Sequence, residues 1–433
     1  MISENLQQSS ASGPPFRRQG GHEVIILAGG LGTRLKDTVP DLPKCMAPVA
    51  GQPFLKHVIR YLLSQGIGKF IFSLGHRHEV IEDFLNTEFP ALDFQCSVED
   101  EPLGTGGAIL LACKRVTEQN VLVINGDTLF KADIQKAVSF HLSNNAECTL
   151  MLKPMQDIDR YGVVELDNDY KVTSFKEKQF FQNGDINAGA YILNVEQFLD
   201  KELPEKFSFE KEYLEKYYSG KKIVGYIQDE YFIDIGIPAD FARAQEELKQ
   251  IPLRLSTIDA GWTIFLDRDG VINYEKEDHY ILNWNEFEFY PGSASAIHIL
   301  SKKFKRVIVI SNQRGVGRGL MTEEDLLDIQ RRMNLKIEED GGRIDKMYYC
   351  KATDPKNFYR KPNPGMALKA AKDFPSIDLS KTIMVGNKPS DMQFGRNAGT
   401  YTVYLKTTHP EQPLPHPDID LAFNSLADFA KAL

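Results

Sequence analysis

The chain has 433 residues, a net charge of -9 and an apolar content of 42%. That length exceeds one typical domain, so two or three domains are expected, and the apolar content is ordinary for a globular protein. No apolar run is long enough to span a bilayer, and the acidic balance argues against a general nucleic-acid binder, so we expect neither a membrane nor a nucleic-acid partner.

The cysteines and the first residues bear on the cell compartment. The five cysteines are scattered and include no C-x-x-C pair, which indicates neither a disulfide framework nor a zinc ribbon and fits a reducing cytoplasm. Residues 1–21 are rich in Ser, Gln, Gly and Pro and lack the apolar centre of a secretory signal. We interpret them as a disordered leader.

A glycine-rich stretch, residues 27–35, follows the apolar run Val24–Ile26, which is typical of a buried strand. Its glycines let the backbone approach an anion, and N–H groups at the entry to a helix suit phosphate. Arg34 offers phosphate a planar fork, and Lys44 supplies a second cation. The spacing is neither Walker A nor G-x-G-x-x-G. A phosphate site is favoured over a tight turn with solvated cations.

Predicted strands and helices alternate from Glu23 to about Gln250, as in a layered α/β domain. A second glycine-rich turn, residues 104–107, opens a helix. The other expected elements are, in order, a helix at 54–65, a strand at 69–74, a helix at 79–86, strands at 94–98 and 121–124, a hairpin over 161–178, strands at 187–193 and 231–236, and a helix at 238–250.

Two aspartates in this half are candidates for binding a metal ion. Asp127 follows a predicted strand, at the edge where open α/β sheets bind ligands, and beside phosphates it would suit magnesium; the alternative is a helix cap. Asp234 lies in an otherwise apolar run, where an unpartnered carboxylate is costly. A metal ion or a Lys or Arg partner should therefore compensate Asp234.

Together with Pro43-Lys44, Glu177-Lys178 and Asn187-Ala-Gly189, these motifs resemble the sugar-1-phosphate nucleotidyltransferase family over residues 23–250. The resemblance implies a Rossmann-like domain with a mixed, GT-A-like sheet, in which a sugar 1-phosphate attacks the α-phosphorus of a nucleoside triphosphate and pyrophosphate leaves. It assigns nucleotide binding to Leu27, Gly29, Gly30, Gly32, Thr33, Gly104 and Thr105, catalysis to Arg34 and Lys44, sugar-phosphate binding to Glu177, Lys178 and Asn187, and magnesium to Asp127 and Asp234.

After a linker at 251–261, a second unit is expected over residues 262–433. Its first predicted strand, 263–266, runs into Asp267-Arg-Asp-Gly270. Two carboxylates two residues apart point to the same side, so one can attack phosphorus while the other handles protons. Strands at 307–310 and 383–385 are followed by further polar groups. A capping box at 322–325 begins a helix.

Four polar sites, beginning at residues 267, 311, 360 and 386, resemble in this order the haloacid dehalogenase superfamily, and more narrowly its heptose bisphosphate and histidinol phosphate phosphatase branch. The resemblance implies a Rossmannoid domain with a minimal cap. It assigns Asp267 as nucleophile, Asp269 as general acid/base, Ser311, Asn312, Arg360, Lys361 and Lys388 to phosphate and substrate, and Asp267, Asp269, Asn387 and Asp391 to magnesium.

Two departures from the phosphatase branch matter. Asn387 replaces the usual aspartate, which should lower metal affinity, and Asp391 is the residue expected to compensate. Cys350 lacks the neighbouring Cys and His of the branch's zinc loop, and tetrahedral zinc needs four ligands, so we predict no zinc.

The two halves make sense as consecutive steps. The N-terminal half resembles the D-glycero-D-manno-heptose 1-phosphate guanylyltransferases, so the expected partners are GTP and sugar phosphates and the expected product is GDP-heptose. The phosphatase half would first remove the C7 phosphate of a heptose 1,7-bisphosphate. The alternatives are a mannose 1-phosphate guanylyltransferase or a uridylyltransferase, fused to a less specific phosphatase or to a degenerate regulatory domain. A homo-oligomer is left open.

Overall fold

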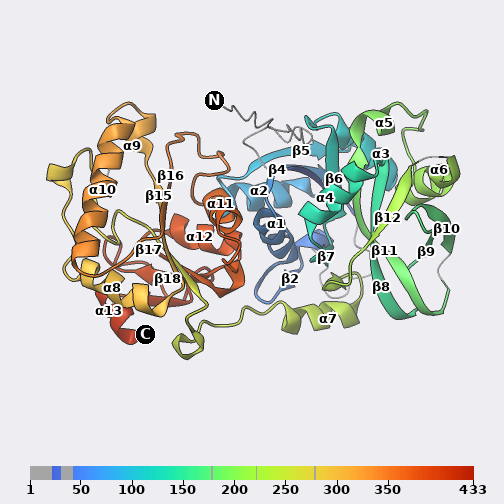
Figure 1. Cartoon of the computed structure of the whole chain (residues 1–433). Coiled ribbons are helices and arrows are strands. Elements are labelled where there is room, and N and C mark those ends of the chain that lie inside the picture. The colour runs from blue at the N-terminus through green and yellow to red at the C-terminus, as the bar shows by residue number, and fades with distance from the viewer. Residues whose placement is uncertain (1–21, 31–41, 177–178, 221, 277–278) are drawn as a thin grey trace, which may run out of the picture.

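The computed structural model describes residues 22–30, 42–176, 179–220, 222–276 and 279–433 and places them in two α/β units. The units lie side by side in Figure 1, and the chain passes once from one to the other, after helix α7. This arrangement confirms the expected fold class, with a mixed sheet in the first unit and a parallel sheet in the second.

A nine-stranded mixed sheet forms the N-terminal unit. The main path runs β10-β9-β11-β6-β1-β4-β5, and β8 joins β11 to β12. The strands are β1 (His22–Leu27), β4 (Ile67–Leu74), β5 (Asp93–Val98), β6 (Asn120–Asn125), β8 (Cys148–Ile158), β9 (Val163–Leu166), β10 (Val172–Lys176), β11 (Phe181–Asn194) and β12 (Ile223–Ile227). The four strands β6, β1, β4 and β5 are parallel, so their carboxyl ends meet along one edge.

Helices and short ladders complete this unit. The helices are α1 (Phe54–Ser64), α2 (His78–Glu88), α3 (Gly104–Cys113), α4 (Ile134–Ser143), α5 (Val195–Leu199), α6 (Glu215–Tyr217) and α7 (Pro238–Glu247), with a π-helix, η2 (Phe209–Leu214). The ladders pair β2 (Pro48–Val49) with β3 (Gln52–Pro53), and β7 (Thr128–Phe130) with β13 (Phe232–Asp234).

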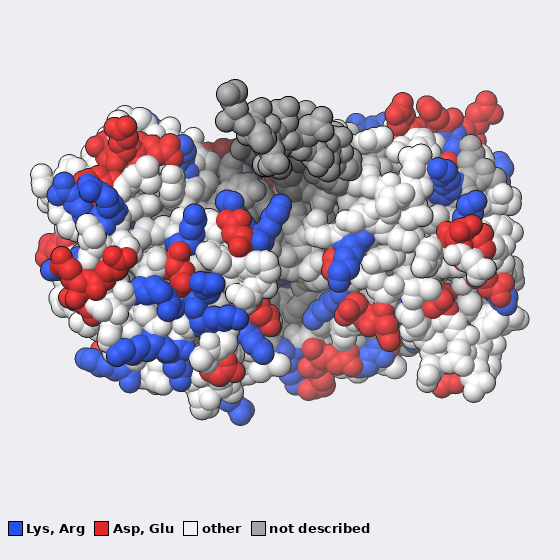
Figure 2. Space-filling view, in the orientation of Figure 1, with Lys and Arg blue, Asp and Glu red and all other residues white. Residues whose placement is uncertain are grey.

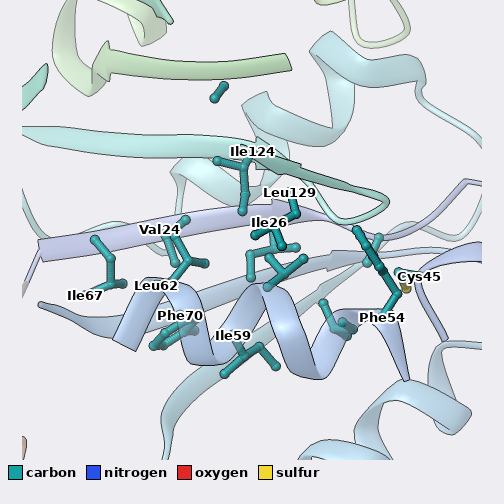
Figure 3. Close-up of a cluster of buried hydrophobic side chains, with 14 of the residues drawn as sticks. Val24, Ile26, Cys45, Phe54, Ile59, Leu62, Ile67, Phe70, Ile124 and Leu129 are labelled. Carbon is teal, nitrogen blue, oxygen red and sulfur yellow. The ribbon is translucent and has the colours of Figure 1, made fainter. Parts of the chain in front are cut away.

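Strand β1 lies between two hydrophobic layers. Its alternate residues Val24 and Ile26 belong to the core that α1 covers, whereas Ile25 belongs to the core on the opposite face of the sheet. Figure 3 shows Val24 beside Leu62 of α1. Burial on both faces explains why this strand has a continuous apolar run instead of an alternating pattern.

The C-terminal unit has a six-stranded parallel sheet in the order β16-β15-β14-β17-β18-β19. The strands are β14 (Thr263–Leu266), β15 (Arg306–Asn312), β16 (Lys346–Cys350), β17 (Thr382–Gly386), β18 (Tyr401–Leu405) and β19 (Leu421–Phe423), and the helices are α8 (Ser293–Lys303), α9 (Arg314–Gly317), α10 (Glu323–Glu339), α11 (Gly365–Asp373), α12 (Pro389–Ala398) and α13 (Leu426–Ala432). Because β14 lies between β15 and β17, the residues that follow these three strands come together.

The expected elements recur with small differences at their ends. The capping box of α10 is present, with Thr322 and Asp325 bonded reciprocally. Asp133, and not Asp127, is the residue that caps α4. No helix among the described residues is long and apolar enough to cross a membrane.

The two units contact each other through α1 and α12. Arg60 of α1 forms an ion pair with Asp418, and both side chains are largely buried. Asn363 donates a hydrogen bond of 3.0 Å to the carbonyl oxygen of Ala91, and Gln250 donates one to Asp420. Figure 2 shows Lys, Arg, Asp and Glu interspersed over the visible face of both units.

Candidate active sites

A cleft of about 1040 Å³ opens at the carboxyl edge of the parallel strands in the N-terminal unit. Its lining comes from the ends of β1, β4, β5 and β6 and from the start of α3. The predicted residues on its wall are Leu27, Gly29, Gly30, Lys44, Gly104, Thr105 and Asp127. The structure thus brings together two glycine-rich segments that are more than 70 residues apart in sequence.

At one end of the cleft, Lys44 lies between two carboxylates. Its Nζ contacts Asp127 Oδ2 and lies 3.4 Å from Asp234 Oδ1. Asp127 follows β6, and Asp234 ends β13, which pairs with β7 directly after Asp127. Burial lowers the pKa of Lys44, but the two carboxylates outweigh it, so the pKa lies above its ordinary value. Burial and the nearby Asp127 raise the pKa of Asp234.

These two carboxylates supply the hard oxygen donors that magnesium prefers. Among the described residues, no group of three or more His, Cys, Asp and Glu side chains could hold a metal ion by itself. An ion at Asp127 and Asp234 would therefore complete its shell with phosphate oxygens and water, which is how magnesium commonly binds in nucleotide sites.

The glycines at the start of α3 have a packing role as well. Gly104 has a φ of +74°, and a Cβ there would stand 2.5 Å from the Phe207 carbonyl oxygen. A Cβ on Gly106 would stand 2.1 Å from the Phe207 ring. The Thr105 hydroxyl donates to Glu210 and accepts from the Phe209 N–H, both at 2.9 Å. This hydroxyl therefore anchors η2, while the residue itself lines the cleft.

The remaining predicted residues of this half are not all brought to the cleft. Asn187 lies on β11, outside the cleft lining, and its amide is bonded to the Tyr191 hydroxyl and the Gly189 N–H. The predictions for Gly32, Thr33, Arg34, Glu177 and Lys178 fall outside the described residues.

Sequence reasoning missed Glu99 in the cleft wall. It follows β5 directly, its Oε2 accepts a hydrogen bond of 3.1 Å from the Leu103 N–H, and its Oε1 would be 3.3 Å from a Cβ on Gly29. The signal was present, because a carboxylate immediately after a parallel strand is the same pattern that singled out Asp127.

In the C-terminal unit, the Lys361 ammonium lies between the carboxylates of Asp267, which follows β14, and Asp391. Its Nζ lies 2.9 Å from Asp267 Oδ1 and 2.7 Å from Asp391 Oδ1, and it donates to the Ile310 carbonyl at 3.1 Å. Asn312 holds the backbone of Lys361 with two hydrogen bonds. Burial, reinforced by Asp391, raises the pKa of Asp267 to about 6 despite the ammonium.

Asp269 faces a different set of partners. Arg268 donates to both of its oxygens at 2.9 Å, Asn273 donates at 3.0 Å and Gln313 donates at 3.1 Å. Gln313 also donates to Ser311 Oγ, so the hydroxyl lies in the same network. Burial raises the pKa of Asp269, but Arg268 and the other donors outweigh it and lower the pKa overall. This network favours the carboxylate, the form that accepts a proton.

The region around Asn387 tests whether a metal ion fits this second site. Both oxygens of Asp391 already have partners, because Lys361 contacts Oδ1 and the N–H groups of Asn387 and Lys388 donate to Oδ2, and its predicted role at magnesium stays a prediction. Asn387 is fully buried, and its Oδ1 has no hydrogen-bond partner among the described residues. This oxygen is buried and accepts no hydrogen bond from the described residues, and Asn387 and Asp267 follow neighbouring strands, β17 and β14. Such an oxygen fits a hard cation.

Arg360 precedes Lys361 in sequence, and Cys350 ends β16. Arg360 donates to the Thr353 carbonyl at 2.9 Å, and burial together with the charge of Arg314 lowers the pKa of its guanidinium. The neighbouring guanidinium groups of Arg360 and Arg314 would suit a second anionic group on a substrate. Cys350 is buried, with Sγ 3.8 Å from Asn357 Oδ1. The absence of zinc stays a prediction.

Residues 23–251, more than half of the chain, match the family model described as Nucleotidyl transferase, and the chain belongs to that family. Residues 263–430 match a second model, described as Polynucleotide kinase 3 phosphatase. The molecule is thus a nucleotidyltransferase joined to a phosphatase-type domain.

Named relatives cover each half. A D-glycero-alpha-D-manno-heptose 1-phosphate guanylyltransferase from Aneurinibacillus thermoaerophilus is 49% identical over 227 residues, which are 52% of this chain and 98% of the relative. The Campylobacter jejuni protein of the same name is 45% identical over 51% of this chain and 96% of the relative. A B. bronchiseptica D,D-heptose 1.7-bisphosphate phosphatase, solved with magnesium and phosphate, is 28% identical, covers 40% of this chain and 97% of its own, and has a TM-score of 0.37.

Proposed function

We propose that this chain carries out two consecutive steps that end in GDP-heptose. The C-terminal domain releases phosphate from C7 of a heptose 1,7-bisphosphate. The N-terminal domain then joins the resulting heptose 1-phosphate to GMP from GTP, and pyrophosphate leaves. The observation that carries the proposal is the 49% identity to a heptose 1-phosphate guanylyltransferase over nearly its whole length. The phosphatase step is supported by the four polar sites of the C-terminal domain, which begin at residues 267, 311, 360 and 386 and resemble those of the haloacid dehalogenase superfamily.

Nucleotidyl transfer needs positioning and positive charge more than covalent help. In the proposed step, the backbone of Gly29 and Gly30 receives the nucleotide phosphates, and Lys44 moves from its two carboxylates toward the α-phosphate. Asp127 and Asp234 would then hold magnesium, which neutralises phosphate charge when bound. The present ion pairs of Lys44 keep both carboxylates compensated until that exchange.

Phosphate removal needs a nucleophile and a proton donor and acceptor. Asp267 attacks the phosphorus, an oxygen–phosphorus bond to the enzyme forms and the sugar oxygen leaves. The proton for that oxygen comes from Asp269, which must first bind one because its hydrogen-bond donors favour the carboxylate. Water then attacks the aspartyl-phosphate as Asp269 accepts its proton, and inorganic phosphate is released. Lys361 and Ser311 hold the phosphoryl oxygens, and Asp267 and Asn387 would hold magnesium, which offsets the charge on the phosphoryl group.

Each proposed activity is assigned to one continuous part of the chain. We assign residues 22–250 to nucleotidyl transfer, 251–261 to the linker and 262–433 to phosphate removal. GTP, sugar phosphates and magnesium are the proposed ligands, and the five free cysteines among the described residues support a reducing cytoplasm.

The test uses the purified full chain with magnesium, heptose 1,7-bisphosphate and one nucleoside triphosphate at a time, with mass spectrometry of the products. GDP-heptose that appears only with GTP supports both steps. Acceptance of heptose 1-phosphate but not of the bisphosphate would refute the phosphatase assignment. If neither heptose reacts and mannose 1-phosphate does, the sugar assignment is wrong.

A further inference from the structure

Glu275 has a contact pattern that the proposed chemistry does not explain. It lies in the loop after Asn273, and only 9% of its side chain is exposed. Its Oε1 accepts a hydrogen bond of 3.0 Å from Asn387 Nδ2, and its Oε2 lies 2.7 Å from Lys388 Nζ. A buried carboxylate thus binds two consecutive residues at the end of β17.

The contact decides which way the Asn387 amide points. A carboxylate only accepts hydrogen bonds, so it requires the NH₂ side of the amide to face it. Nδ2 also donates to Thr408 Oγ1 at 2.8 Å, but a hydroxyl could serve either side of the amide. Glu275 is therefore the group that selects the orientation.

Asn387 follows β17, which pairs with β14, the strand that Asp267 follows. Asn387 packs against Gly270, where a Cβ would stand 2.0 Å from Nδ2 and 2.8 Å from Oδ1, so no larger residue fits between the amide and the loop that carries Asp267 and Asp269. Oδ1 is the buried oxygen without a described hydrogen-bond partner. The amide orientation chosen by Glu275 leaves this oxygen for an electropositive ligand.

We propose that Glu275 is a positioning residue that aims Asn387 Oδ1 at the divalent cation and supplies, one bond further out, the negative charge that asparagine lacks. The inference rests on the proposed phosphatase function. Groups that orient a metal ligand commonly change metal affinity about 10- to 100-fold when they are replaced. The negative charge of Glu275 would act on the cation by polarising the Asn387 amide. The ion pair with Lys388 compensates the partly buried carboxylate of Glu275.

The test is the affinity of the full chain for Mn²⁺, measured by electron paramagnetic resonance and by competition with Mg²⁺. An Asp127→Asn background weakens the other candidate metal site. Glu275→Gln should weaken Mn²⁺ binding about tenfold, because Gln can present either its oxygen or its nitrogen to Asn387. Thr408→Val should lose less. Glu286→Gln, which removes a carboxylate paired with Lys276 in the same loop, should lose nothing.

The decisive comparison adds Asn387→Asp. Asp at 387 would supply its own charge and would face Glu275 as a like charge, so Glu275→Gln should now strengthen Mn²⁺ binding. Equal effects of Glu275→Gln in both backgrounds, or no effect in either, would overturn the proposal. Melting temperatures of all variants separate loss of affinity from loss of folding, and the reversal of sign does not depend on either variant being fully stable.

Failure of the proposed function would look different. A chain that shows the reversal but releases no phosphate from heptose 1,7-bisphosphate overturns the substrate and leaves the role of Glu275 in place. A chain in which Asn387→Ala removes no Mn²⁺ site overturns the role of Glu275 itself.

Discussion

Arg60 and Asp418 offer a direct test of how the two units are joined. Their ion pair links residues 358 positions apart, with 16% of the Arg60 side chain and 5% of the Asp418 side chain exposed. Burial raises the pKa of Asp418, but Arg60, Lys56 and Arg396 outweigh it and lower the pKa overall. Arg60→Met would remove the nearest of these cations and leave a buried carboxylate in the other unit.

The magnitude follows from that geometry. Breaking one side of a buried ion pair costs about 3–5 kcal/mol, and the two remaining cations should reduce this to about 2 kcal/mol. In a double-mutant cycle with Asp418→Asn, we expect a coupling energy of about 1–2 kcal/mol. The cost should appear in the stability of the C-terminal unit, although Arg60 belongs to the N-terminal one.

The chain allows these contributions to be separated. Its two tryptophans, Trp262 and Trp284, both lie in the C-terminal unit, so tryptophan fluorescence during urea unfolding reports on that unit alone. Lys69→Met is the matched control, because Lys69 is paired with Glu23 inside the N-terminal unit. If Arg60→Met moves the tryptophan transition no further than Lys69→Met does, the contact between the units is not the one described here.

Three further outcomes are expected. Lys361→Met should reduce phosphate release by about 10²- to 10³-fold, since two carboxylates lose their shared cation, and should leave nucleotidyl transfer unchanged; separate assays of phosphate and pyrophosphate check this. Gly106→Ala should destabilise the N-terminal unit by about 1–3 kcal/mol because of the clash with Phe207, whereas Gly30→Ala, whose Cβ would meet no atom of the described residues within 4 Å, should cost less; thermal unfolding compares the two. Burial lowers the pKa of His141 from 6.5 to about 4, so its contribution is fully present above pH 6.5 and is lost as the pH falls toward 4, by about 3 kcal/mol. Unfolding free energies across that range should fall less steeply for His141→Gln; identical slopes would contradict the assignment.

The elements with a strong local pattern were predictable from sequence. The helix at Phe54 has apolar residues at the helical spacing, and the capping box at Thr322 fixes where α10 begins. Strands β8 and β12 were not predicted. Each is stabilised by its neighbours in the sheet, with Cys148 opposite Ile223, and that pairing spans 75 residues that no local window contains.

The candidate sites were predictable where a polar residue ends a strand. Asp127, Asp267 and Ser311 all follow this rule, because the parallel order of a sheet brings such positions to one edge. The partners were harder to anticipate. Nothing near Lys44 in sequence shows that Asp127 and Asp234 enclose it, since that contact depends on the pairing of β7 with β13.

The long sequence separation of Arg60 and Asp418 also has a consequence for synthesis. At about 5–20 residues per second, the ribosome needs roughly 20–70 s to make the 358 residues between them. Helix α1 can pack into its own unit during that time, while the surface of α1 that later contacts α12 remains exposed to solvent. The residues of α1 that lie against the second unit include Arg60 and Ser64, and polar side chains on a surface exposed before its partner is made lower its tendency to aggregate.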